Sequence, residues 1–112
     1  MYVSAKLEEL EKIIEISDLP ILIYFYGSWC GPCRRMGPVF ESMSSELEGL
    51  YKFVKIVVDD VEEEVMFKYK VGVVPTIIFI KDNKEVARLE GYKNKDDISK
   101  TMAQAFHKND GA

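Results

Sequence analysis

Three short apolar runs constrain the fold of this chain more than any other feature of its sequence. Ile21–Tyr26 is apolar almost throughout. Residues 53–58, interrupted only by Lys55, and residues 76–80 are comparable runs that end at charged side chains. A strand that is covered on both faces of a sheet has no solvent-facing side, so its sequence is apolar at consecutive positions. The runs therefore predict three central strands of a sheet that carries helices on both faces.

Segments with helical periodicity separate and follow these runs. Apolar residues spaced by three and four predict a helix over 5–16, a long helix after Cys33, and a last helix capped by Asn94. Glu62–Tyr69 has an acidic first turn that suits the helix dipole, and it predicts a further short helix. Pro38 lies inside the long helix and should bend it. The apolar stripe of that helix consists of Met36, Phe40, Met43, Leu47 and Leu50.

Two further strands complete the predicted sheet. Residues 85–90 pair with the third apolar run through a tight turn at 82–84, and residues 2–4 form a short edge strand. The order (β)αβαβαββα predicts an α/β protein with a central mixed sheet of four to five strands, flanked by about four helices. We expect a single domain over residues 1–112, with residues 108–112 as a frayed tail.

Charge and hydropathy limit the partners and the compartment. The 112 residues carry 15 Lys and Arg against 19 Asp and Glu, a net charge of −4. Nucleic acids and anionic membranes are recognised by clustered Lys and Arg, so we expect neither as a partner. No apolar run approaches the roughly 20 residues of a membrane-spanning helix. The first twenty residues carry several glutamates and do not resemble a signal peptide, so we expect a cytoplasmic protein.

The only two cysteines, Cys30 and Cys33, lie where the first apolar run ends and a helix begins. Unpaired amide groups at a helix start stabilise negative charge, so the thiol of Cys30 should have a lowered pKa and be the more exposed of the two. Arg34 and Arg35 could add positive potential, and Cys33 should be shielded one turn further on. This arrangement suits dithiol–disulfide exchange, in which Cys30 attacks a disulfide and Cys33 resolves the mixed disulfide.

Other interpretations of these polar features are weaker. A structural zinc site needs four ligands, whereas the sequence offers no other cysteine and a single histidine, His107. A structural disulfide across so small a loop would gain little chain-entropy stabilisation. The acidic run at 59–64 could suggest a metal or partner site, but a solvated loop and a helix N-terminus explain it as well.

The segment Trp-Cys-Gly-Pro-Cys lies at 29–33. It is the active-site motif of the thioredoxin family letter for letter, and the sequence resembles that family over nearly its whole length. The segment Val-Pro-Thr at 74–76 matches the one whose proline is cis and packs beside the disulfide in the family. Pro38 matches the proline inside the family's helix, and Gly91 matches a glycine beside its substrate groove.

This resemblance implies a reaction mechanism and a docking surface. Cys30 would be the attacking nucleophile and Cys33 the resolving cysteine, and the peptide bond before Pro75 would be cis. The backbone of Val74 would then pair with an extended strand of the substrate, which tolerates many substrate side chains. The shallow docking surface would consist of Trp29, Gly31, Pro32, Val74, Pro75, Gly91 and Tyr92.

The resemblance also implies partners. The chain would be a thiol–disulfide oxidoreductase that reduces disulfide-containing client proteins and is itself reduced by a thioredoxin reductase. It would need no metal or organic cofactor besides its redox-active disulfide, and we expect a monomer. Two alternatives remain open: a disulfide oxidase or isomerase of the same fold, and a binding module or assembly subunit that uses no thiol chemistry.

The sequence departs from the family at the position of a buried aspartate, which here is Tyr24. The family uses that acid, with a nearby lysine matched by Lys55, in proton transfer to and from the buried cysteine. Deprotonation of Cys33 would then depend on water, Lys55 or Tyr24, and Lys55 would lack its usual carboxylate. Alternatively, Tyr24 only fills space and Lys55 extends to solvent. Tyr92 replaces a residue that is usually small, and its bulk could narrow the choice of partner.

Overall fold

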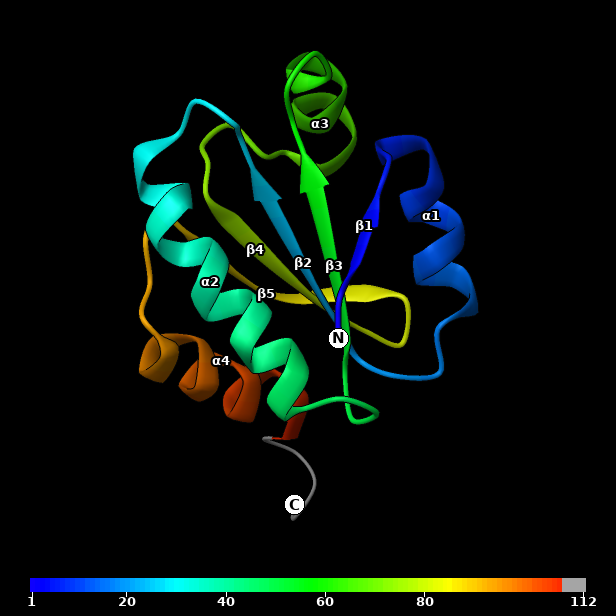
Figure 1. Cartoon of the computed structure of the whole chain (residues 1–112). Coiled ribbons are helices and arrows are strands. Elements are labelled where there is room, and N and C mark those ends of the chain that lie inside the picture. Colours follow the sequence, from blue (N-terminus) through cyan, green and yellow to red (C-terminus); the bar gives the residue numbers. More distant parts are fainter. Residues whose placement is uncertain (108–112) are drawn as a thin grey trace.

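The computed structural model describes residues 1–107, which form five strands and four helices (Figure 1). In chain order they are β1 (Val3–Ala5), α1 (Leu7–Ile16), β2 (Ile21–Tyr26), α2 (Gly31–Glu46), β3 (Lys52–Val57), α3 (Glu62–Tyr69), β4 (Thr76–Lys81), β5 (Lys84–Glu90) and α4 (Lys95–His107). The predicted order and number of elements are confirmed for this part of the chain. The tail expected at 108–112 lies outside the described residues.

The five strands form one mixed sheet in the order β1-β3-β2-β4-β5. β3 pairs in parallel with both β1 and β2, while β4 pairs antiparallel with β2 and β5. The strand that leads to the cysteines, β2, is therefore central. Its register places Tyr24 beside Lys55 of β3 and beside Ile77 of β4.

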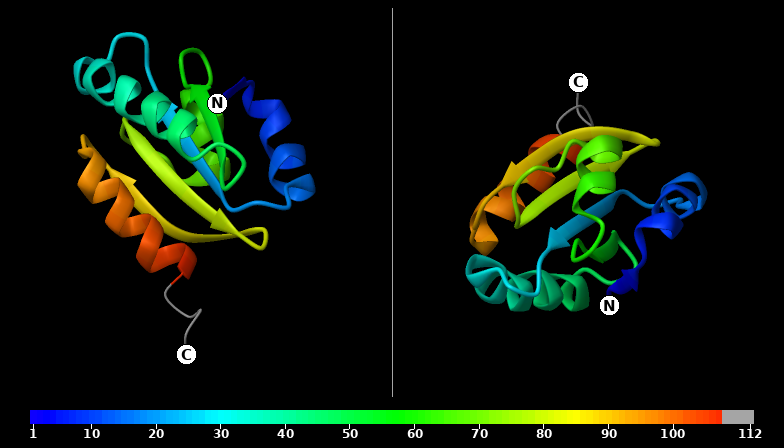
Figure 2. Two further views of the ribbon diagram at one scale, coloured as in Figure 1. Left: turned by 60° about the horizontal axis from the view of Figure 1, so that its bottom comes forward. Right: turned by 90° about the horizontal axis from the view of Figure 1, so that it is seen from above.

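Helices cover both faces of the sheet, which is why the central strands have no polar side (Figures 1 and 2). Side chains alternate along a strand, so each of the central strands β2, β3 and β4 supplies both cores. In β2, Ile21, Ile23 and Phe25 pack toward α1 and α3, whereas Leu22 and Tyr24 pack toward α2 and α4. All five of these side chains are at most 1% exposed.

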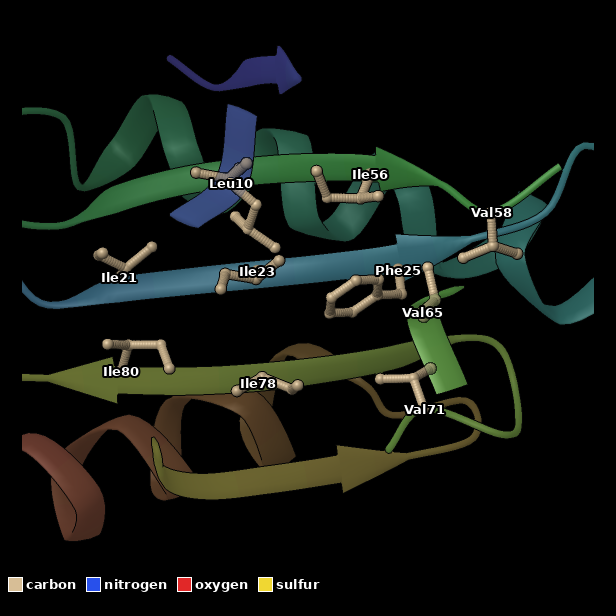
Figure 3. Packing of buried hydrophobic residues seen from close by; sticks show 11 residues of the cluster. Leu10, Ile21, Ile23, Phe25, Ile56, Val58, Val65, Val71, Ile78 and Ile80 are labelled. Atoms are coloured by element: carbon tan, nitrogen blue, oxygen red, sulfur yellow. The ribbon is translucent and has the colours of Figure 1, made fainter. Parts of the chain in front are cut away.

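The core on the α1 and α3 side is aliphatic except for one ring (Figure 3). Leu10 of α1 and Val65 of α3 lie over the strands at 0% and 1% exposure. Complete burial of such a side chain contributes about 1.5–3 kcal/mol each before entropy costs. The core on the opposite side, under α2 and α4, is richer in aromatic rings, with five among its eleven buried residues, and there the ring of Phe40 stacks on Tyr24 with centroids 5.1 Å apart.

Local chain chemistry explains the boundaries, and it corrects three predictions. The helix α2 ends at Glu46, so Leu47 is its C-cap and Leu50 is 60% exposed rather than part of the buried stripe. Gly49, at a φ of +84°, turns the chain toward β3. β3 begins at Lys52, one residue before the predicted run, and ends at Val57. The hairpin turn contains only Asp82 and Asn83, at φ of +51° and +67°, which suits a two-residue turn between twisted strands.

The predicted cap of the last helix is confirmed. The Asn94 side-chain oxygen accepts from the backbone N–H of Asp97 at 2.9 Å, and an Asp97 carboxylate oxygen accepts from the Asn94 N–H at 3.2 Å. This reciprocal pair satisfies two amide groups at the start of α4. Within residues 1–107, none of the helices is long and apolar enough to cross a membrane. No three His, Cys, Asp or Glu side chains gather there in a way that could hold a metal ion.

Candidate redox-active site

The two cysteines lie at the junction of β2 and α2 and form a disulfide with each other. Cys30 is the N-cap residue of α2, and Cys33 is inside its first turn. Pro32 occupies a first-turn position of α2, where the missing N–H of proline leaves no helical hydrogen bond unmade. The Cα atoms of the two cysteines are 5.2 Å apart, within the ordinary range for a disulfide.

The helix start provides a donor to the Cys30 sulfur. The backbone N–H of Cys33 donates to Cys30 Sγ at 3.2 Å, so the sulfur occupies the place of a capping oxygen. The same N–H would stabilise a thiolate at this position once the disulfide is reduced. In the disulfide form both cysteines are 4% exposed, so the predicted difference in exposure is absent. Val74 explains the burial of Cys30, since its carbonyl oxygen lies 3.7 Å from Cys30 Sγ.

Trp29 forms an exposed aromatic surface beside the disulfide, with 62% of the residue accessible. Its indole folds back over the preceding loop at Gly27. A Cβ on Gly27 would lie 2.9 Å from Trp29 Cε2, so a side chain at that position would displace the ring. On the helix side, the guanidinium of Arg35 stacks on the ring of Tyr92 at 4.3 Å. Arg35 therefore lies against the predicted rim residue.

The loop before β4 approaches the disulfide from the other side. The Val74–Pro75 peptide bond is cis. The Thr76 hydroxyl donates to the carbonyl of Val73 at 2.7 Å, and the N–H of Gly91 donates to the carbonyl of Pro75 at 2.8 Å. Gly91 has a φ of +86°, which a residue with a side chain rarely adopts. These bonds hold the Val74 backbone in place next to Cys30.

An apolar hollow of about 880 Å³ opens between Trp29 and α3. Trp29 and Val74 line it, but the other predicted docking residues do not. Its remaining lining was not predicted from the sequence, and it includes Val58, Met66, Phe67 and Val73. Phe67 and Met66 are 78% and 52% exposed. The large apolar side chains of α3 could have indicated this hollow. A short helix with a single buried residue, Val65, leaves its other apolar residues on the surface.

Tyr24 and Lys55 are neighbours in the sheet, but their side chains form hydrogen bonds with different partners. The Tyr24 hydroxyl donates to the carbonyl of Cys33 at 2.9 Å. Lys55 Nζ instead donates to Glu41 of α2 at 2.6 Å. The expectation that Lys55 lacks a carboxylate is therefore wrong, and so is the alternative that it extends freely to solvent, since its side chain is only 12% exposed. Burial, and to a smaller extent negative charge at Tyr26 and Glu41, raises the pKa of Tyr24.

Hydrogen bonds join the cysteine loop to the loop after β3. The backbone N–H of Ser28 donates to an Asp59 carboxylate oxygen at 3.1 Å, and the Ser28 hydroxyl donates to the other oxygen. These bonds lower the pKa of the Asp59 carboxyl, since they favour its charged form. The first residue of the acidic run therefore holds the cysteine loop in position.

Comparisons with known proteins agree with this geometry. The sequence profile of the thioredoxin family matches residues 2–104. The chain belongs to the thioredoxin family. A solved thioredoxin from Fasciola hepatica is 39% identical, covers 94% of this chain and 99% of its own, and superposes with a TM-score of 0.79.

Curated relatives include thioredoxins and one much longer enzyme. The thioredoxin of Haemophilus influenzae is 33% identical over 96 residues, which is 86% of this chain and 89% of that protein. A peptide-N(4)-(N-acetyl-beta-glucosaminyl)asparagine amidase of Caenorhabditis elegans is 36% identical over 102 residues, 89% of this chain but 16% of the amidase. The chain thus corresponds to nearly the whole of one relative and to a small part of the other.

Members of the thioredoxin family are protein-disulfide oxidoreductases, and the Cys30–Cys33 pair supports this activity here. Thioredoxins work without a cofactor besides the redox-active disulfide. The Trp-Cys-Gly-Pro-Cys motif is present here, and the carboxylate that meets Lys55 belongs to α2. No local pattern predicts the contact between Glu41 and Lys55, because they are 14 residues apart in the chain.

Proposed function

We propose that this chain reduces disulfides in client proteins, with Cys30 as the attacking nucleophile and Cys33 as the resolving cysteine. The observation that carries the proposal is the N–H of Cys33, which points at Cys30 Sγ at the start of α2. A donor in that place favours the thiolate, which is the nucleophilic form of a cysteine. The sulfur of Cys33 is not at the N-cap position of α2, because Cys33 lies inside the first turn of the helix.

The reaction consists of two exchanges between sulfur atoms. The Cys30 thiolate attacks one sulfur of the client disulfide, a Cys30–client bond forms, and the second client sulfur leaves with the electron pair. Cys33 then attacks Cys30 Sγ, which breaks the mixed disulfide and forms the Cys30–Cys33 bond. The client gains two electrons and the dithiol loses two. A thioredoxin reductase would return the disulfide to the dithiol form.

The client would dock on the surface around Cys30. Val74, whose carbonyl lies 3.7 Å from Cys30 Sγ, would offer its backbone to an extended client segment. Gly31, Pro32, Pro75, Gly91 and Tyr92 would complete the contact close to the disulfide. The hollow between Trp29 and α3 would take an apolar client side chain, since exposed apolar surface of this kind is common at protein interfaces.

We place this activity in the cytoplasm, where cellular reductants keep thiols reduced and a reductase can supply electrons. A monomer is sufficient, because both sulfur atoms and the docking surface belong to one chain. A single domain over residues 1–112 is sufficient for the same reason.

The test is reduction of a disulfide-bonded protein such as insulin, coupled to a thioredoxin reductase, with wild type, Cys30→Ser and Cys33→Ser compared. Cys30→Ser should abolish turnover, whereas Cys33→Ser should stop after one exchange and accumulate a mixed disulfide that mass spectrometry detects. Turnover that persists in Cys30→Ser would overturn the proposal. An equilibrium with glutathione that strongly favours the dithiol form would instead identify a disulfide oxidase.

A further inference from the structure

A small crevice beside the disulfide has both Cys33 and Glu41 in its wall. Its volume is about 270 Å³, which is room for several water molecules at roughly 30 Å³ each. Tyr24, Tyr26, Gly37 and Lys55 also line it, together with Gly27, Ser28, Arg34 and Pro38. The crevice therefore connects the resolving cysteine with a carboxylate that the sequence analysis did not consider.

The spacing along α2 explains why these two residues share a crevice. Cys33, Gly37 and Glu41 are at i, i+4 and i+8, so they lie on one face of the helix. Gly37 has no side chain, and a Cβ built there would find only the Tyr24 hydroxyl oxygen within 4 Å, at 3.9 Å. The space above Gly37 is therefore open and lies between Cys33 and Glu41. Cys33 and Glu41 are eight residues apart, which is about 12 Å along the helix axis. A proton that moves from one to the other must therefore pass through water.

Four other polar side chains of the crevice, Tyr24, Ser28, Arg34 and Lys55, are unsuited to accept a proton from Cys33. The Tyr24 hydroxyl donates to the Cys33 carbonyl, and burial raises its pKa, so it retains its own proton. The Ser28 hydroxyl is bonded to Asp59. Arg34 and Lys55 are cations without a free lone pair. The Lys55 ammonium lies between the rings of Tyr2 and Tyr26, at 5.0 and 4.8 Å.

Glu41 remains as the carboxylate in the crevice wall among the residues that the structure describes. Its Oε2 atom accepts from Lys55 Nζ at 2.6 Å, and its side chain is 39% exposed. The ion pair holds the carboxylate against the sheet, and the partial exposure leaves it in contact with water. Lys55 is therefore suited to a positioning role.

We propose that Glu41 accepts, through water in this crevice, the proton that leaves Cys33 in the resolving step, and that Lys55 positions the Glu41 carboxylate. This inference rests on the proposed function, since it concerns the second exchange of that reaction. It assigns the proton transfer to α2 and not to the β2 position that Tyr24 occupies.

The step balances without any further reactant. The Cys33 S–H proton passes through water to a Glu41 oxygen, and the electron pair left on sulfur attacks Cys30 Sγ. The Cys30–client bond breaks, and its electron pair leaves with the client sulfur. The proton on Glu41 then returns through water to the client thiolate or to solvent, and Glu41 is again a carboxylate beside Lys55.

The experiment compares Glu41→Gln with a matched control, Glu46→Gln. Glu46 is also on α2 and also pairs with a lysine, Lys95, at 2.8 Å, but it lies outside the crevice wall. A symmetrical chromogenic aromatic disulfide is mixed rapidly with the reduced protein. It releases one coloured thiolate when Cys30 attacks and a second when Cys33 resolves, so one trace reports both steps.

Glu41→Gln should leave the first release within about twofold of wild type and slow the second by about 100-fold or more, because one acid–base group contributes about 10²- to 10⁴-fold. Its second release should also rise about tenfold per pH unit below the thiol's ordinary ionisation range, because the thiol must then lose its proton to hydroxide or water. Glu46→Gln should match wild type in both phases. Glu41→Asp should restore part of the second rate.

Equal second-release rates in Glu41→Gln and Glu46→Gln, with the same pH profile as wild type, would overturn the inference while leaving the proposed function intact. A wild-type protein that releases no thiolate would instead overturn the proposed function. Thermal unfolding of the two glutamine variants checks that both are folded. If Glu41→Gln does not fold, Lys55→Met gives the same test, since it retains the acceptor and should slow only the second release.

Discussion

Removal of a single oxygen atom tests how the buried tyrosine contributes to the fold. Tyr24 is 1% exposed, and its hydroxyl donates to the Cys33 carbonyl at 2.9 Å. Tyr24→Phe deletes this bond but keeps the ring, which stacks on Tyr26 at 5.3 Å and on Phe40 at 5.1 Å. One such bond contributes about 1 kcal/mol. We therefore expect a loss of about 1 kcal/mol at neutral pH, or roughly 4 °C in Tm for a domain of this size.

The pH dependence of the same variant has a definite sign. Burial raises the pKa of Tyr24 in the folded protein above its ordinary value of 10.0. The stability linked to this group is then fully present below pH 10 and is lost as pH rises above it, because only the unfolded chain releases the proton. By pH 11 the loss is about 1.4 kcal/mol. Tyr24→Phe has no such loss. At pH 11 the variant should therefore be as stable as wild type or more stable, although it is less stable at neutral pH.

Urea unfolding of the oxidised proteins between pH 7 and pH 11 measures both effects. The midpoints of wild type and Tyr24→Phe should converge as pH rises, with unchanged m-values. Burial also raises the pKa of Tyr69, but that residue is present in both proteins and cancels in the comparison. Tyr92→Phe, at the exposed rim, is the control and should follow wild type. Parallel curves for wild type and Tyr24→Phe, or equal stability at pH 7, would refute the reasoning.

Three further predictions concern the acid side, the core and the docking surface. Hydrogen bonds from Ser28 lower the pKa of the Asp59 carboxyl in the folded protein. The stability from this contact is therefore present above about pH 4, and it is lost as pH falls through the lowered pKa of Asp59. Asp59→Asn should remove that part of the acid dependence in urea titrations. Phe40→Ala removes a fully buried ring and should cost about 3–5 kcal/mol, measured from the urea midpoint. Phe67→Ser, on the exposed face of α3, should change stability by less than about 0.5 kcal/mol yet raise the KM for a protein client, while the rate with a small aromatic disulfide stays the same.

The predicted elements agree with the structure where short stretches of chain decide the conformation. Ile21–Tyr26 is a central strand because alternate residues enter two different cores, and that requirement is visible as an uninterrupted apolar run. The cap at Asn94 is a contact over three residues. The predicted stripe through Leu50 failed for a local reason as well, since α2 already ends at Glu46 and the chain then turns at Gly49, which apolar periodicity does not show.

The site divides in the same way. The cysteine motif and its place at a helix start can be predicted from adjacent residues, because the amide groups of a helix N-terminus stabilise negative charge on the residue that caps it, here Cys30. The cis bond before Pro75 could be expected only from family resemblance, since a cis form is the minority state of such bonds, at roughly 5–6% in folded proteins.

The sequence by itself determined the strands, the helices and the reactive pair, because each depends on hydrogen bonds and apolar spacing within a few residues. It also indicated the family, through the motif at 29–33 and the segment at 74–76. Tertiary structure alone decided that Lys55 meets Glu41, that Gly37 leaves a crevice above it, and that α3 presents Phe67 beside Trp29. These contacts join residues from different elements. Their formation depends on how α2 and α3 lie against the sheet, and the packing of the two cores sets that placement.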